Sequence, residues 1–159
     1  MKQIRSVAIL GAGTMGSQIA AHMANAGLPT LLLDIDKQTA LAGLQRAKRL
    51  KPAPFFSADS EALISVGGFE SHLIHLQEYD WIVEAIVEQL DAKRQLLERV
   101  DAVRTLGTIV SSNTSGIPIV DITKDRSTDF RKYSLGTHFF NPPRYLSLLE
   151  IIPTRETDP

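Results

Sequence analysis

The 159-residue sequence has no cysteine, which excludes disulfides, thiolate nucleophiles and cysteine-ligated metals. Lysine and arginine number 17 against 18 aspartates and glutamates, so the formal net charge is −1. This balance lacks the basic surplus of a nucleic-acid-binding protein, and we expect no nucleic acid partner. Apolar runs of about 18 residues are also missing, so we expect no membrane span. A reducing, cytoplasmic location fits the missing cysteines.

Hydrophobic residues make up 43% of the chain and charged residues 22%, which are ordinary proportions for a folded domain. We expect one domain over residues 1–159. Short apolar segments alternate with helix-forming segments, which predicts an α/β fold: a Rossmann-type doubly wound, mainly parallel sheet flanked by helices. Strands are expected over 4–10, 29–34, 81–87, 108–112, 133–140 and 145–152, and helices over 14–26, 37–51 and 91–104. The stretch 53–71 is too irregular to assign.

A glycine motif, Gly11-x-Gly13-x-x-Gly16, follows the first predicted strand and opens the first predicted helix. Such a motif is a weak signal by itself, but this context is the one that the dinucleotide fingerprint requires. Gly11 permits a tight turn, Gly13 lets a pyrophosphate approach the backbone, and Gly16 lets the helix pack closely on the strand. The N–H groups at the start of the helix then hold the phosphates.

Asp34 ends the second predicted strand, about 20 residues after the last glycine. A carboxylate at this place accepts hydrogen bonds from the adenosine ribose and repels a 2′-phosphate, so the sequence predicts NAD rather than NADP. The alternative is a plain strand–turn–helix unit in which Asp34 merely caps the next helix. Both halves of the fingerprint together favour the cofactor site.

Acidic and hydroxyl-bearing residues follow two further predicted strands. Glu84 and Glu88 come at the end of the strand that begins at Trp81, at the sheet edge where open α/β sheets bind ligands. From their position alone, it is equally possible that the two glutamates are solvated loop residues. The segment 111–116, Ser-Ser-Asn-Thr-Ser-Gly, turns at the same edge after the next strand. It is either part of a site or a polar loop that caps the following helix.

His138 ends an apolar strand, where a histidine is more often structural than catalytic. Glu150 changes this balance, because it interrupts the apolar run Leu148–Ile152 and would be costly to bury without a partner. We expect Glu150 to pair with His138, which would fix the tautomer and leave the other ring nitrogen free as a base. A solvent-facing Glu150 on an edge strand is the alternative.

Other titratable residues receive more ordinary interpretations. Cations near the end of the second predicted helix either meet CoA phosphates or stabilise the helix C-terminus, and we favour the second role; they are Arg46, Lys48, Arg49 and Lys51. We assign no metal site, and we expect surface or packing roles for the remaining histidines, His22, His72 and His75.

Four motifs together resemble the NAD-binding domain of the 3-hydroxyacyl-CoA dehydrogenase family. They are the glycine loop 11–16, Val83–Glu88, Ser112–Ser115 and His138–Pro142, in that order. The resemblance covers nearly the whole chain, and its last two motifs are far more specific than the glycine loop. Segments 51–54, 137–142 and 149–159 are most similar to a bacterial subgroup whose longer chains also carry an enoyl-CoA hydratase-like portion.

The resemblance implies NAD-dependent oxidation of L-3-hydroxyacyl-CoA to 3-ketoacyl-CoA, a step of fatty acid β-oxidation. It implies that His138 is the general base for the 3-hydroxyl proton, that Glu150 orients and polarises His138, and that Ser115 hydrogen-bonds the oxygen at C3. The cofactor carries the hydride. The implied NAD-binding positions are Gly11, Gly13, Thr14, Met15, Gly16, Asp34, Ile35, Ala85, Ile86, Glu88, Lys93, Asn113 and Asn141.

In the family, this domain continues into a helical second domain of about a hundred residues, which supplies part of the acyl pocket and the dimer interface. We therefore expect a fragment that exposes apolar surface at its end and forms homo-oligomers through it. Two other functions stay open: a non-catalytic NAD-binding module, and a Rossmann dehydrogenase for another small hydroxy acid. The fold alone does not decide among them.

Overall fold

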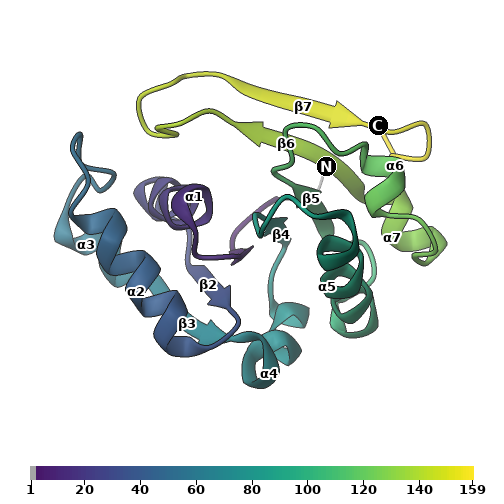
Figure 1. The fold of residues 1–159 in the computed structure, drawn as a ribbon, viewed down its shortest axis with the longest axis horizontal. Helices are drawn as coiled ribbons and strands as arrows, with labels where there is room; N and C mark the ends of the chain where they lie inside the picture. The colour runs from purple at the N-terminus through teal and green to yellow at the C-terminus, as the bar shows by residue number, and fades with distance from the viewer. Residues whose placement is uncertain (1–2) are drawn as a thin grey trace.

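The computed structural model describes residues 3–159. Within them, seven strands form one sheet in the order β3-β2-β1-β4-β5-β6-β7 (Figure 1). Neighbouring strands are parallel except β6 and β7, which are antiparallel. This confirms the predicted doubly wound α/β class. The strands are β1 (Val7–Leu10), β2 (Thr30–Asp34), β3 (Ile64–Gly68), β4 (Trp81–Glu84), β5 (Ile109–Ser112), β6 (Ser134–Phe139) and β7 (Leu149–Pro153).

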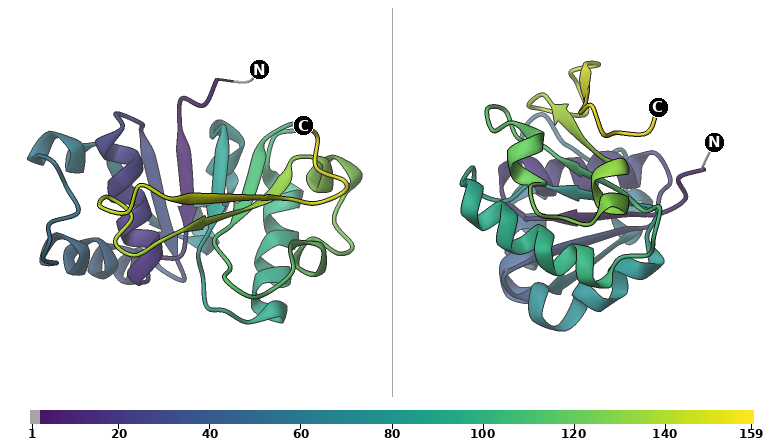
Figure 2. Two further views of the ribbon diagram at one scale, coloured as in Figure 1. Left: turned by 90° about the horizontal axis from the view of Figure 1, so that it is seen from above. Right: turned by 90° about the vertical axis from the view of Figure 1, so that its right-hand side faces the viewer.

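Helices cover both faces of the sheet. One face packs against α1 (Thr14–Asn25) and α2 (Lys37–Lys48), and α3 (Ala58–Ala62) contacts α1. The other face packs against five short or medium helical elements: α4 (Phe69–His72), the 3₁₀ helix η1 (Leu73–Glu78), α5 (Leu90–Val103), α6 (Ile119–Ile122) and α7 (Thr128–Lys132). The sheet twists so strongly that β7 runs across the direction of β1 (Figure 2), as expected when twist accumulates over many strands.

The central strand β1 is buried on both faces, and all four of its residues are inaccessible. Ile9 belongs to the core beneath α1, whereas Leu10 belongs to the core beneath α5. This is why the strand is continuously apolar rather than alternating, as is usual for parallel sheets. The turn that follows β1 therefore begins at a fully buried strand.

One predicted strand is wrong in its bounds, and the stretch left unassigned contains regular structure. The strand predicted over 145–152 begins only at Leu149, because Tyr145 and Leu146 form a turn in which both N–H groups donate to the carbonyl of Pro142. The unassigned stretch 53–71 contains α3, β3 and the start of α4. The sequence of β3, Ile-Ser-Val-Gly-Gly, has too few apolar residues to be recognised as a strand.

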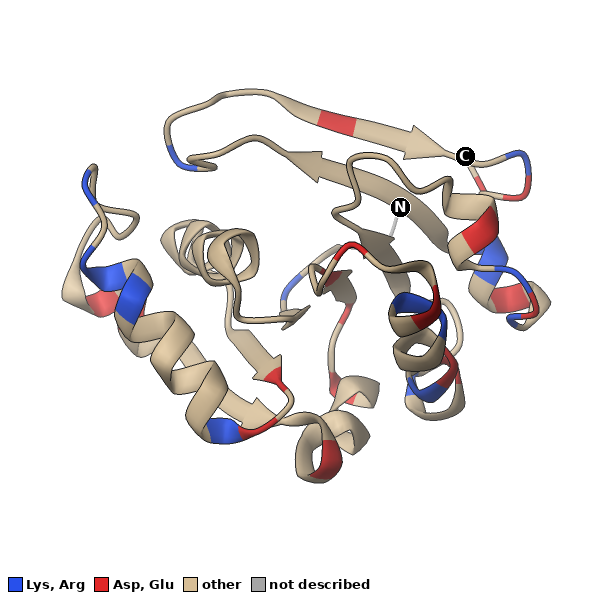
Figure 3. Cartoon of the chain, viewed as in Figure 1, with Lys and Arg blue, Asp and Glu red and all other residues tan. Residues whose placement is uncertain are grey.

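Charged residues are distributed unevenly among the helices (Figure 3). Helix α1 carries none, α2 carries only the cations Lys37, Arg46 and Lys48, and α5 carries both signs. The uncharged α1 packs deeply, with eight of its residues buried. Its first turn is therefore free of side-chain charge at the end that faces the glycine loop.

Candidate dinucleotide and catalytic site

The glycine loop joins β1 to α1. Gly11 has φ of 106°, and a Cβ on it would lie 2.6 Å from the carbonyl oxygen of Ala85. A Cβ on Gly16 would lie 1.8 Å from the carbonyl oxygen of Gly11. Around Gly13, in contrast, nothing lies within 4 Å of such a Cβ. The fold itself thus requires Gly11 and Gly16, whereas Gly13 leaves open a space that a ligand can use.

The start of α1 complements this open space. Gly13 occupies the N-cap position without a side-chain hydrogen bond, and no acidic residue lies in the first turn. Backbone N–H groups at such a helix start favour an anion, and a pyrophosphate is the anion that the glycine motif accommodates. A dinucleotide therefore fits the residues that form the loop.

Asp34 ties the end of β2 to the glycine loop. Its Oδ2 accepts a hydrogen bond from the backbone N–H of Ala12 at 2.6 Å, and its Oδ1 accepts one from Ile35 at 2.7 Å. The cap of α2 is instead Asp36, whose Oδ1 accepts from the backbone N–H of Thr39 at 2.7 Å. The alternative in which Asp34 only caps the next helix is therefore wrong. The neighbouring Ile35 side chain is 67% exposed and faces away from the core.

Glu84, at the end of β4, lies in the interior and is 0% exposed. Its Oε1 accepts from the Lys93 ammonium at 2.7 Å and from the backbone N–H of Ile86 at 2.7 Å. Its Oε2 accepts from the hydroxyl of Ser112. The interpretation of Glu84 as a solvated loop residue is thus wrong. Three partners satisfy this carboxylate, as a buried charge requires.

Glu88 continues this network toward solvent. Its Oε2 lies 3.2 Å from the Lys93 Nζ, and its Oε1 accepts from the Thr114 hydroxyl and from the backbone N–H groups of Ser115 and Gly116 at 3.1 and 3.3 Å. Partial burial acts to raise the pKa of Glu88, but the Thr114 hydrogen bond and the Lys93 contacts outweigh it and lower the pKa. The Ser115 loop is therefore held by an ionised carboxylate.

Asn113 connects β5 to its neighbours on both sides. Its backbone N–H donates to the carbonyl of Glu84 at 2.8 Å, and its side-chain Oδ1 accepts from the backbone N–H of Phe139 at 2.8 Å. Ser115, two residues on, is exposed. The loop thus presents a serine hydroxyl at the carboxyl edge of the sheet, between the ends of β4 and β6.

His138 and Glu150 face each other across the antiparallel pair β6–β7. The His138 Nδ1 lies 2.8 Å from the Glu150 Oε2, which confirms the expected pairing. Because Nδ1 is engaged, Nε2 is the nitrogen left to act on a substrate. The burial argument for this pair was wrong, however: β7 is exposed along its length, and the Glu150 side chain is 50% exposed. Because β7 is the edge strand of the sheet, its side chains are exposed, and its pairing with β6 still brings Glu150 opposite His138.

Asn141 lies just after β6 and reaches back to α1. Its Oδ1 accepts from the Gln18 side chain at 3.1 Å, and Gln18 also donates to the carbonyl of Thr14. This contact joins the loop after His138 to the first turn of the glycine-loop helix. Gln18 was not predicted as a site residue, although its position one turn after Thr14 places it on the same helix face.

The other candidate residues have local partners. Arg46 donates to the carbonyl of Ala12 at 3.3 Å, and Lys48 forms an ion pair with Glu61 at 2.8 Å. His72 and His75 contact each other, with ring centroids 5.9 Å apart. Among residues 3–159, no three histidines, cysteines or carboxylates gather as metal ligands would. No helix in the same residues is long and apolar enough to cross a bilayer.

The sheet is doubly wound, and Gly13 faces open space at the start of α1. An acid ends β2, and a histidine–carboxylate pair lies at the same edge of the sheet. Together these features define a nicotinamide-dependent oxidoreductase domain. Sequence comparison then places it more narrowly. Residues 6–159 match the profile of the "3-hydroxyacyl-CoA dehydrogenase, NAD binding domain". The chain belongs to this family, and its cofactor is NAD, as the sequence predicted.

Two bacterial relatives carry the name "Probable 3-hydroxyacyl-CoA dehydrogenase". The one from Deinococcus radiodurans is 51% identical over 164 residues, covering 99% of this chain and 47% of the relative. The one from Bacillus subtilis is 48% identical over 179 residues, covering 99% of this chain and 23% of the relative. This chain therefore spans less than half the length of these relatives.

Solved structures agree with this placement. FadB2 of Mycobacterium tuberculosis superposes with a TM-score of 0.84 at 30% identity, covering 99% of this chain and 56% of that chain. The 3-hydroxybutyryl-CoA dehydrogenase of Escherichia coli superposes with a TM-score of 0.82 at 25% identity, covering 98% of this chain and 34% of that chain. The fold of this chain is thus shared with a solved 3-hydroxybutyryl-CoA dehydrogenase.

Proposed function

We propose that this chain is the NAD-binding and catalytic-base domain of an enzyme that oxidises L-3-hydroxyacyl-CoA to 3-ketoacyl-CoA. The observation that carries the proposal is the His138–Glu150 pair at 2.8 Å, at the carboxyl edge of the sheet that also carries the glycine loop. NAD⁺, when bound, supplies the hydride acceptor. We place this step in fatty acid oxidation and the chain in the cytoplasm.

The residues of the chain supply the proton acceptor and the hydrogen bond to the substrate oxygen. His138 takes the proton of the 3-hydroxyl on Nε2, while Glu150 holds the ring through Nδ1 and stabilises the imidazolium that forms. The exposed Ser115 hydroxyl donates to the oxygen at C3, which becomes the ketone oxygen. This places the base and the hydroxyl donor on neighbouring strand ends, so the substrate oxygen lies between them.

The proposed cofactor positions follow the carboxyl edge of the sheet. Asp34 and Ile35 border the adenosine end, and the glycine loop holds the pyrophosphate. Glu88 and Asn113 border the nicotinamide end of the cofactor. Asn141 supports that end through its contact with Gln18. The remaining proposed positions are Thr14, Met15, Ala85 and Ile86. Lys93, which is 1% exposed, acts through Glu84 and Glu88 rather than by touching the cofactor.

A helical second domain is part of the proposal, because the chain spans only 47% of its Deinococcus relative. That domain would close the acyl pocket over Ser115 and His138. To test the function, residues 1–159 can be joined to the remaining residues of the Deinococcus protein. We expect NAD-linked oxidation of L-3-hydroxybutyryl-CoA and not of free 3-hydroxybutyrate.

The catalytic role of His138 is tested in the same chimera. His138→Gln should lower kcat by about 10²–10⁴-fold, because a general base contributes about that much, while NADH binding stays unchanged. Turnover of the free hydroxy acid instead of the CoA ester would indicate another Rossmann dehydrogenase. NADH binding without any turnover, in the chimera with His138 intact, would indicate a cofactor-binding module.

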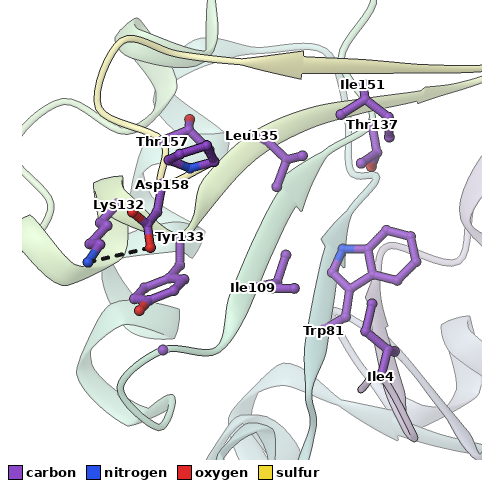
Figure 4. A pocket seen from close by; sticks show the side chains of 12 residues that line it. Ile4, Trp81, Ile109, Lys132, Tyr133, Leu135, Thr137, Ile151, Thr157 and Asp158 are labelled. Carbon is purple, nitrogen blue, oxygen red and sulfur yellow. Dashed lines mark ion pairs between the residues drawn. The ribbon is translucent and has the colours of Figure 1, made fainter. Parts of the chain in front are cut away.

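We also propose a second copy of this chain as a partner. A cavity of about 610 Å³ opens beside β4 to β7, lined by Trp81, Ile109, Leu135 and Ile151 among others (Figure 4). An ion pair between Lys132 and Asp158, 3.5 Å long, borders it. Strand β7 forms the adjacent sheet edge, and exposed apolar edges of this kind favour isologous pairing.

A further inference from the structure

The Glu84–Lys93–Glu88 network places three charged groups at and after the end of β4. One buried ammonium bridges two carboxylates, at 2.7 Å from Glu84 and 3.2 Å from Glu88. Lys93 and Glu84 are 1% and 0% exposed, whereas the Glu88 side chain is 43% exposed. The inner carboxylate and the ammonium thus balance each other in the interior, and one negative charge remains on the outer carboxylate.

Glu88 is held in place by its surroundings. Lys93 contacts one of its oxygens, and the Thr114 hydroxyl and the backbone N–H groups of Ser115 and Gly116 contact the other. These hydrogen bonds and the neighbouring ammonium keep the carboxylate ionised, as the lowered pKa of Glu88 indicates. The charge is therefore fixed in position as well as in sign.

The order of the strands places this charge along the path of the cofactor. The glycine loop follows β1, Glu88 follows β4, Ser115 follows β5 and His138 lies on β6, and these strands are neighbours in this order. A dinucleotide whose pyrophosphate lies at the glycine loop must cross the end of β4 to bring its nicotinamide to Ser115 and His138. Glu88 hydrogen-bonds Ser115 directly, so it borders the place where the ring reacts.

We propose that Glu88, held by Lys93, determines the preference of this site for the redox state of the cofactor. The nicotinamide ring of NAD⁺ carries a positive charge and that of NADH is neutral, so a fixed carboxylate beside the ring favours the oxidised form. The same charge favours release of NADH after hydride transfer. The inference rests on the proposed function, because it is that function which brings the ring to Ser115.

Glu88→Gln tests the inference, because glutamine has nearly the same shape. Its carbonyl oxygen can accept the bonds from Thr114, Ser115 and Gly116, while an uncharged amide replaces the oxygen that faces Lys93. Calorimetric titration of the 159-residue chain with NAD⁺ and with NADH measures both dissociation constants. We expect the ratio Kd(NAD⁺)/Kd(NADH) to rise about fivefold at low salt, and the rise to shrink at 0.5 M salt because the charge is partly exposed.

The matched control is Glu98→Gln, which removes an exposed carboxylate from α5, the helix that follows Glu88, about 12 Å along the axis from its first residue. This control should leave the ratio unchanged, and the amide resonances of Ser115 and Gly116 should show that the loop keeps its place in Glu88→Gln. An unchanged ratio, or equal weakening of both forms, would overturn the inference and leave the function standing. Failure of the wild-type chain to bind either form would overturn both.

Discussion

At the scale of single residues, the three glycines of the glycine loop have two different roles: two are required by the fold, and one leaves space for the ligand. Gly11 and Gly16 have backbone atoms at 2.6 and 1.8 Å from an added Cβ, whereas Gly13 has open space. All three belong to one motif in the sequence, and only the packing tells them apart. This difference leads to opposite expectations for two alanine substitutions.

Gly13→Ala should abolish or strongly weaken NADH binding while changing the free energy of unfolding by less than about 1 kcal/mol, because its φ of −68° suits alanine. Gly16→Ala should lower the free energy of unfolding by roughly 1–3 kcal/mol or more, since its Cβ meets a backbone oxygen. Urea unfolding and NADH titration of both variants measure the contrast. Full NADH affinity in Gly13→Ala would contradict the proposed pyrophosphate position.

Two aspartates near the end of β2 have separate roles. Asp34→Ala should raise the Kd for NADH by about tenfold or more, because a ribose hydrogen bond and the Ala12 contact are both lost. It should also narrow the difference between NADH and NADPH, since the repulsion of a 2′-phosphate disappears.

The control for Asp34 is Asp36→Ala, two residues away. It removes the cap of α2, so it should lower Tm while leaving the Kd for NADH unchanged. If both variants weakened NADH binding equally, Asp34 would not be the residue that binds the adenosine ribose.

At the scale of elements, the C-terminal end of α5 is joined to α7 by one buried guanidinium. Arg104 is 7% exposed. It donates to Asp129 at 2.7 Å, and it also contacts Asp101 and Ser127. These bonds connect the two helices on the face opposite to α1. Partial burial acts to raise the pKa of Asp129, but the hydrogen bonds from Gly107 and Arg104 outweigh it and lower the pKa.

The lowered pKa of Asp129 predicts an acid-dependent loss of stability. Because the folded state favours the ionised form, the contribution is present above the ordinary value of 3.8 and is lost as pH falls through the folded pKa. Asp129→Asn should therefore destabilise the protein at pH 7, and the difference from wild type should shrink below about pH 4. Urea unfolding between pH 3 and 7 measures it, with Glu98→Gln as the control. A difference that stays constant with pH would contradict this.

At the scale of the whole molecule, the sheet is covered unequally. Helices cover the α5 face out to β6. A cavity of about 610 Å³ instead opens beside β4 to β7. Ile151 is 56% exposed at its border. Parallel sheets normally bury both faces, so the second copy proposed above would contact the chain at this cavity.

Ile151→Lys should shift the chain from dimer to monomer, because it places a charge in the proposed contact. Light scattering over a concentration series measures the change. Val120→Lys is the control, since Val120 is 55% exposed on α6, away from this face. A wild-type chain that stays monomeric at high concentration would rule out the second copy as partner.

Much of this arrangement was predictable from the sequence, because the signals are local. Continuous apolar runs indicate β1 and β2, and the glycine spacing indicates the turn between β1 and α1. The His138–Glu150 pair was also predicted, although from a burial that the edge strand does not have. Local signals failed at β3, whose pairing with β2 rather than its own residues makes it a strand.

The sequence by itself determined the fold class, the NAD fingerprint and the order of the motifs along the chain, because each depends on residues close together in sequence. Only the tertiary structure decided that Glu84 is buried, that Lys93 joins it to Glu88, and that Gln18 reaches Asn141. The physical reason is that these contacts connect neighbouring strand ends and loops, and strand order in a parallel sheet is set by packing between distant segments.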